Sequence, residues 1–282
     1  MLLSRSDVWS ASCESLAATM RPHSDDAVGS APKDLVSVQS NALALPENRA
    51  ARLWLVFGST TAVLLVLVAV LAPRSVGIAR FDEHVTASMS ALRHPVLTRV
   101  AQLITDLGSY RPVTALSIGL ALFLAYRTRR LLEPLVLLAA VEAASSLVEV
   151  LKTAIVRARP PMEGMLGPPV FDYSFPSGHA GGSTVVYVLG ALLLAIAEHW
   201  SSARRRLMVA AGCVVAGLIG LSRVYLGYHW LTDVVGAWLL AMTFVCIGMV
   251  FVTANRRPDW DSALPDIVVP RNALAGPPAP RT

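Results

Sequence analysis

Charged side chains are scarce in this sequence. Only 15% of its 282 residues are Asp, Glu, Lys or Arg, whereas 54% are hydrophobic and the mean hydropathy is +0.56. A soluble domain of this length usually has about a quarter of its residues charged. The composition therefore excludes an ordinary soluble globular domain and predicts an integral membrane protein.

Cysteine is also rare, with three residues in the whole chain. Cys13 lies in a polar segment, while Cys213 and Cys246 lie inside apolar runs, where small buried thiols are common. This set supports neither a disulfide framework nor a cysteine metal site.

The N-terminal segment lacks a continuous apolar stretch followed by a small-residue cleavage site, so we expect no cleaved signal peptide. The net charge of +5 could suggest nucleic-acid binding. However, the arginines cluster in short segments between apolar runs, which is how orientation in a membrane is encoded. We therefore expect a bilayer, and no nucleic acid, as the partner of this chain.

Six apolar runs approach the length that a bilayer-spanning helix needs, which is about 17 to 25 residues. The fold class expected is an all-α integral membrane bundle of six transmembrane helices. The runs are Leu53 to Ala72, Val113 to Tyr126, Leu131 to Leu151, Ala180 to Ala197, Leu207 to Arg223, and Leu231 to Ala254.

The rest of the chain divides around this bundle. Residues 1–50 and 256–282 are rich in small, polar and proline residues and are predicted to be flexible tails, leaving 51–255 as the six-span domain. Between Pro73 and Pro112, apolar residues from Val96 to Leu107 recur at helical spacing. We predict an interfacial helix there; the alternative is a loop with scattered apolar residues.

An even number of spans places both termini on one side of the membrane. The arginine clusters at 127–130, 204–206 and 256–257 abut span ends on that side, which the positive-inside rule assigns to the cytoplasm. The total count of cations is nearly even between the two sides, so the position of these clusters in short loops decides the assignment. We expect a plasma-membrane protein with cytoplasmic termini.

Three polar stretches fall at the ends of the last four spans. They are KTAIVRARP (152–160), PSGH (176–179) and SRVYLGYHWLTD (222–233). The order of the spans brings all three to the same, extracytoplasmic face, where their side chains would form one site.

This collection of residues suits an oxyanion such as phosphate. Arg159 and Arg223 offer planar forks for phosphoryl oxygens, and Lys152 adds a mobile charge. Ser177 and Gly178 precede an apolar helix whose first amides and dipole point toward the same place. Each feature has a simpler explanation in isolation, but their shared location favours a phosphate site.

Two histidines supply the reactive groups of this predicted site. His229 and Asp233 are four residues apart, which would place them on one face of a helix, with the carboxylate orienting the ring for nucleophilic attack. His179, on another helix, remains to protonate the leaving oxygen and then to activate water.

The three stretches together resemble the motif of the type 2 phosphatidic acid phosphatase superfamily, which includes vanadium-dependent haloperoxidases. The resemblance covers about residues 53–254 and departs from the motif at no position. It implies a phosphohistidine at His229, an orienting Asp233, His179 as general acid and base, and hydrolysis without a metal or other cofactor. The phosphate-binding residues that it implies are Lys152, Arg159, Ser177, Gly178 and Arg223.

The sequence thus predicts a membrane phosphatase for a lipid phosphate or diphosphate, such as phosphatidic acid, phosphatidylglycerol phosphate or a prenyl diphosphate. A phosphotransferase using the same histidine is the main alternative; a haloperoxidase and a non-catalytic lipid transporter are weaker ones. The sequence leaves the oligomeric state open.

Two acidic residues and one loop complete the predictions. Glu149 lies one turn before Lys152 and is expected to pair with it, although a water-filled vestibule or a neutral acid would also explain Glu149 and Glu142 within the third span. The loop PMEGMLGPPVFDYS (161–174), which contains Phe171, is expected to form a rim over the site.

Overall fold

The computed structural model describes residues 49–255, so both predicted tails lie outside the described residues and the predicted domain division stays a prediction. The described part contains helices and connecting loops, without a strand. Its elements are α2 (Arg49–Leu71), α3 (Val76–Ala91), α4 (Pro95–Asp106), α5 (Tyr110–Thr128), α6 (Leu132–Ile155), η3 (Met162–Gly164), α7 (Gly178–Thr184), η4 (Val185–Leu189), α8 (Gly190–Ala197), α9 (Ser202–Tyr225) and α10 (Leu231–Asn255).

The long apolar helices confirm the predicted membrane bundle. Five spans are long and apolar enough to cross a bilayer, with α7, η4 and α8 forming one of them. A sixth span results if α4 and α5, which meet at a bend of 46°, are taken together. The chain is therefore a multi-pass membrane protein of all-α class.

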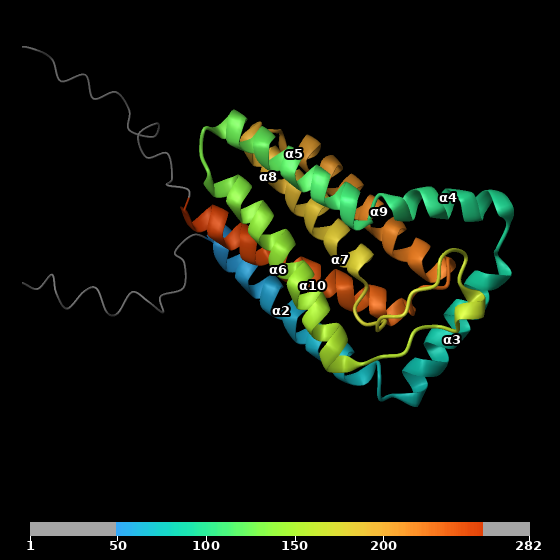
Figure 1. Ribbon diagram of the computed structural model, residues 1–282. Helices are drawn as coiled ribbons and strands as arrows, with labels where there is room; N and C mark the ends of the chain where they lie inside the picture. The colour runs from blue at the N-terminus through green and yellow to red at the C-terminus, as the bar shows by residue number, and fades with distance from the viewer. Residues whose placement is uncertain (1–48, 256–282) are drawn as a thin grey trace, which may run out of the picture. The chain divides into compact units, whose positions relative to one another are not determined.

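The first connection contains two helices where the sequence predicted one. The predicted apolar segment is α4, which begins with His94 as its N-cap and Pro95 in its first turn. The second helix, α3, was not predicted, because charged residues interrupt its apolar ones. Ser75 is its N-cap, and the Ser75 hydroxyl accepts a hydrogen bond from the Ile78 amide at 3.4 Å. Figure 1 shows α4 diverging from the bundle. Its predicted position at the membrane interface stays a prediction.

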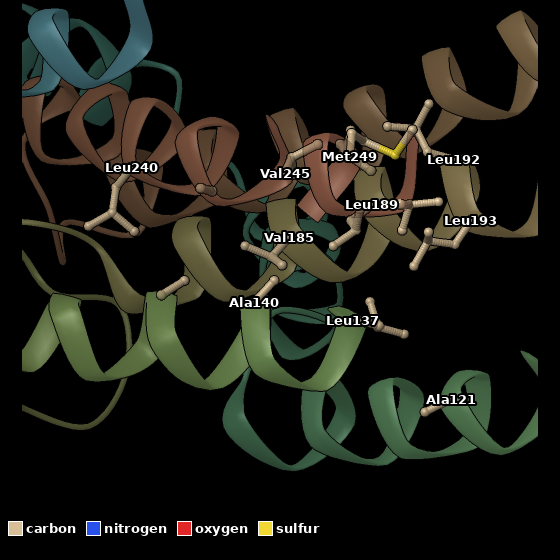
Figure 2. Packing of buried hydrophobic residues seen from close by; sticks show 14 of the residues in the cluster. Ala121, Leu137, Ala140, Val185, Leu189, Leu192, Leu193, Leu240, Val245 and Met249 are labelled. Carbon is tan, nitrogen blue, oxygen red and sulfur yellow. The ribbon is translucent and has the colours of Figure 1, made fainter. Parts of the chain in front are cut away.

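The core of the bundle lies around the span formed by α7, η4 and α8. Figure 2 shows Val185 and Leu189 of this span between Ala140 of α6 and Val245 of α10. Five residues of this span adopt the wider π-helical turn η4, which hydrophobic periodicity does not reveal. A well-packed core here fixes the ends of α6, α7 and α10 relative to one another.

Helix α2 packs along α10 by close contact of small residues. Thr61 and Thr243 share a hydrogen bond at 2.9 Å between their hydroxyl oxygens. A Cβ atom added to Gly58 would lie 2.8 Å from Cys246 Cβ, so glycine permits this approach.

Candidate active site

The three polar stretches meet at one end of the described bundle, as their order predicted. The Ser177 amide donates to the Asp233 carbonyl at 3.2 Å, which joins the start of α7 to the start of α10. The Trp230 indole donates to the Ala158 carbonyl at 2.9 Å, which joins the segment after α6 to the same place. The predicted site residues therefore share one region.

His229 lies before α10 and not within it, so the prediction that His229 and Asp233 share a helical face is wrong. Helix α10 begins at Leu231, because the Asp233 carboxylate turns back and accepts a hydrogen bond from the Trp230 amide at 2.9 Å. The chain reaches this point through a tight turn at Gly227, whose φ is +81°. The two residues are close all the same, with 3.5 Å between His229 Nδ1 and Asp233 Oδ2.

The His229 ring has a different neighbour at each nitrogen. Nδ1 faces Asp233 but is too far away for a hydrogen bond, and it has no other partner among the described residues. Nε2 lies 3.2 Å from Nη1 of Arg159. The lone pair of a ring protonated on Nδ1 would therefore face the guanidinium that is expected to bind phosphate.

Burial sets the charge of this ring. Loss of hydration lowers the pKa of His229 to about 4, although the Asp233 carboxylate acts in the opposite direction. The nearby Arg159 and Arg223 add to the lowering. The ring is consequently neutral at pH 7, which is the form that can act as a nucleophile.

Asp233 also belongs to a buried ion network that the sequence did not predict. Arg157 donates to Asp233 Oδ1 at 2.5 Å and to Asp82 Oδ2 at 2.7 Å, and all three side chains are buried. Thr232 completes the network, because its amide donates to Asp82 Oδ1 at 3.1 Å. Arg157 is thus committed to two carboxylates, and it holds Asp233 in place beside His229.

Lys152 and Arg159 meet on the carboxylate of Asp172. Lys152 Nζ donates to Asp172 Oδ2 at 2.6 Å, while Arg159 donates to Oδ1 through Nη2 and, at 3.1 Å, through Nε. Burial raises the pKa of Asp172, but the hydrogen bonds from the two cations outweigh this effect and lower the pKa overall. Lys152 also contacts Glu149 at 3.0 Å, which confirms the predicted pair.

Arg223 lies on the wall of a cavity of about 420 Å³ together with His179. Its guanidinium stacks over the Tyr228 ring at 4.0 Å from the centroid and donates to the Thr105 hydroxyl at 3.2 Å. Its Nε has no hydrogen-bond partner among the described residues, although it is buried. An unpaired buried donor of this kind is available to a ligand oxygen.

His179 lies on the walls of two cavities. The first is the cavity beside Arg223, and the second, of about 610 Å³, extends between α5, α6 and α7 past Gly178. His179 also lies within electrostatic reach of Arg223, His229, Lys152 and Arg159. Ser177 is the N-cap of α7, and its hydroxyl accepts from the Ala180 amide at 3.5 Å. All eight predicted residues thus lie in or beside one polar region.

The loop 161–174 lies beside the first cavity, as the rim prediction required. Leu166, Gly167, Pro168 and Val170 line that cavity, while Phe171 is 81% exposed. Arg93 anchors the loop by donating to the Gly164 carbonyl at 2.8 Å.

Sequence reasoning missed Asp82, Asp172, Thr105 and the role of Arg157. Asp82 and Thr105 lie on α3 and α4, far from the motifs along the chain, and no spacing rule connects them. Asp172 could have been noticed as the carboxylate four residues before Pro176. Glu142, the other acidic residue predicted inside α6, accepts a hydrogen bond from Ser146 at 3.4 Å.

The described residues 49–255 contain no group of three or more His, Cys, Asp or Glu side chains placed to hold a metal ion. The expectation of hydrolysis without metal stays a prediction.

Comparison with known proteins places this site in a family context. Residues 130–257 match the family model described as the PAP2 superfamily. The chain is 32% identical over 163 residues to phosphatidylglycerophosphatase B of Bacillus subtilis, a match that covers 57% of this chain and 78% of that protein. It is 40% identical over 76 residues to an undecaprenyl-diphosphatase of Sulfolobus acidocaldarius, covering 27% of this chain and 32% of the other.

A solved structure has a similar fold. It is the crystal structure of a transmembrane PAP2 type phosphatidylglycerolphosphate phosphatase from Bacillus subtilis, which matches with a TM-score of 0.67 and 26% identity. The match covers 71% of this chain and 98% of that structure.

Proposed function

Because the chain belongs to the PAP2 superfamily and is a membrane phosphatase of that superfamily, we propose that it hydrolyses a lipid phosphate or diphosphate through a phosphohistidine at His229. One observation carries this proposal. The neutral, buried ring of His229 directs Nε2 to Arg159 at 3.2 Å, next to the cations suited to bind phosphate.

In the proposed first step, the Nε2 lone pair of His229 attacks phosphorus and the bond from phosphorus to the lipid oxygen breaks. His179 donates a proton to that leaving oxygen, so the lipid departs as a neutral alcohol or, from a diphosphate, as a monophosphate. The Asp233 carboxylate stabilises the positive charge that develops on the His229 ring. Its distance of 3.5 Å from Nδ1 would shorten as this charge appears.

In the second step, His179 accepts a proton from water, and the resulting nucleophile attacks phosphorus. The bond from Nε2 to phosphorus breaks, orthophosphate is released, and His229 returns to its neutral form. Both steps pass through a five-coordinate phosphorus whose extra charge falls on the equatorial oxygens. Lys152, Arg159, Arg223, the Ser177 hydroxyl and the Gly178 amide would bind those oxygens.

The substrate class follows from the position of the site at the end of apolar spans. A phosphate head group can reach His229 from the aqueous side while its acyl or prenyl tail stays in the bilayer. Phosphatidylglycerol phosphate and undecaprenyl diphosphate are the substrates named for the two relatives, and both satisfy this geometry. We propose that the site faces the extracytoplasmic side of the plasma membrane.

The test is phosphate release by the purified protein in detergent, with chelator present, from a panel of lipid monophosphates and diphosphates. The wild type should release orthophosphate from at least one of them. His229→Ala should abolish release, and Arg159→Ala should lower it by about a hundred- to a thousandfold, the usual cost of one well-placed donor. If His229→Ala released phosphate at the wild-type rate, His229 would be excluded as the nucleophile. Transfer of phosphate to an alcohol, with little orthophosphate, would indicate a phosphotransferase instead.

A further inference from the structure

Asp172 occupies the two cations that are expected to bind the substrate. Each oxygen of its carboxylate is taken by a different cation, Oδ2 by Lys152 at 2.6 Å and Oδ1 by Arg159. Carboxylate and phosphate oxygens accept the same hydrogen bonds from lysine and arginine. A phosphate that binds to both cations must therefore take the place of this carboxylate.

The carboxylate can leave without a rearrangement of the backbone. The Asp172 side chain is 44% exposed, so rotation about its side-chain bonds brings it into water. The backbone stays anchored, because the Asp172 carbonyl accepts from Arg159 Nε at 2.9 Å and the nearby Ser174 amide donates to the Arg157 carbonyl at 2.9 Å. The Lys152 and Arg159 side chains are only 12% and 8% exposed, so both cations need an anionic partner, and a phosphate that replaces the carboxylate supplies one.

We propose that Asp172 is an intramolecular competitor that exchanges with phosphate on Lys152 and Arg159 and so lowers the affinity of the site for every phosphate ligand. This proposal rests on the proposed function, because it takes these two cations to be the phosphate-binding groups. A phosphoryl group with two negative charges and three free oxygens can displace the single carboxylate. When orthophosphate leaves, Asp172 returns to the cations.

The competitor would serve a site at a membrane surface. Phosphodiester head groups are abundant in a phospholipid bilayer and would occupy an uncompensated pair of cations. Because every ligand must displace Asp172, weak ligands such as these head groups, and the orthophosphate product, do not saturate the site. The competition does not alter the order of preference among ligands, because all of them displace the same carboxylate.

The experiment is titration of the purified protein in detergent with orthophosphate, followed calorimetrically, for the wild type, Asp172→Asn and Glu163→Gln. Asparagine retains the size and one acceptor oxygen of Asp172 but removes its charge. Asp172→Asn should bind orthophosphate about three- to tenfold more tightly than the wild type. Glu163 is exposed on the same loop, and its substitution makes the same change in net charge away from the two cations. Glu163→Gln should bind like the wild type.

A gain of at least about threefold in Asp172→Asn over Glu163→Gln supports the competitor. A smaller gain, or weaker binding in a variant whose thermal unfolding is unchanged, overturns it and indicates that Asp172 positions Lys152 and Arg159 instead. The titration needs no turnover, so it remains decisive if no lipid phosphate is hydrolysed. Failure of the proposed function would be seen as a wild type that releases no phosphate, whatever the titration gives.

Discussion

His229 is 2% exposed and lies among groups that act on its charge in opposite directions. Burial lowers its pKa to about 4, Asp233 opposes this, and Arg159 and Arg223 reinforce it. The ordinary pKa of a histidine is about 6.5. The folded protein therefore keeps this ring neutral through a pH range in which the unfolded chain protonates it.

This difference makes stability depend on pH in a defined direction. Because the folded pKa lies below the unfolded one, the contribution of neutral His229 is fully present above pH 6.5 and is lost as the pH falls toward 4. The loss at the acid end is on the order of 3 kcal/mol. Between pH 6.5 and 4, the thermal unfolding temperature in detergent should fall more steeply for the wild type than for His229→Gln, whose side chain cannot titrate. Parallel curves for the two proteins would contradict this assignment.

At the scale of the elements, Arg157 joins three parts of the fold that are distant in the sequence. It follows the C-terminal end of α6 and contacts Asp82 on α3 and Asp233 on α10. Both carboxylates are almost fully buried, at 1% and 0% exposure. Removing the guanidinium would leave two buried negative charges without their shared partner, which is far more costly than losing a surface pair.

Arg157→Leu should therefore destabilise the protein by about 3 to 5 kcal/mol, the usual cost of breaking a buried ion pair. The matched control is Arg127→Leu, because Arg127 also pairs with a carboxylate, Glu198 at 2.6 Å, but both side chains are partly exposed. The control should lose far less stability than Arg157→Leu, because solvent screens an exposed pair. Denaturant midpoints measured in detergent compare the two variants. Similar losses of stability in both variants would show that the buried network contributes no more to stability than a surface ion pair does.

The same network shows where sequence reasoning succeeds and where it stops. Hydropathy located the spans, and motif spacing located Lys152, Arg159, His179, Arg223 and His229, because each signal is local in the chain. Asp82 is about 75 residues from Arg157, and its role depends on how α3 folds against the bundle. The wrong helix start at His229 has a similar cause, since α10 begins only at Leu231, where the Asp233 carboxylate accepts from the Trp230 amide. Tertiary contacts of this kind leave no periodic pattern.

At the scale of the described bundle, residues 49–255, polar groups gather at two ends. One end contains the candidate site and the loop 161–174. The connections from α5 to α6 and from α8 to α9 lie at the opposite ends of the same spans. Arginines at these helix ends, 127–130 and 204–206, are the basis for the prediction that this end faces the cytoplasm. A lipid phosphatase with this orientation would act on head groups outside the cell.

Labelling of single cysteines tests this orientation. In a protein whose three native cysteines, Cys13, Cys213 and Cys246, are replaced, one new cysteine is placed at Glu163 in the site loop or at Ser202 at the start of α9, both of which are exposed. A membrane-impermeant maleimide added to intact cells should label Glu163→Cys and leave Ser202→Cys unlabelled until the membrane is opened. Because the two positions lie at opposite ends of the spans, the reverse pattern would place the site in the cytoplasm, and with it the phosphate that the enzyme releases.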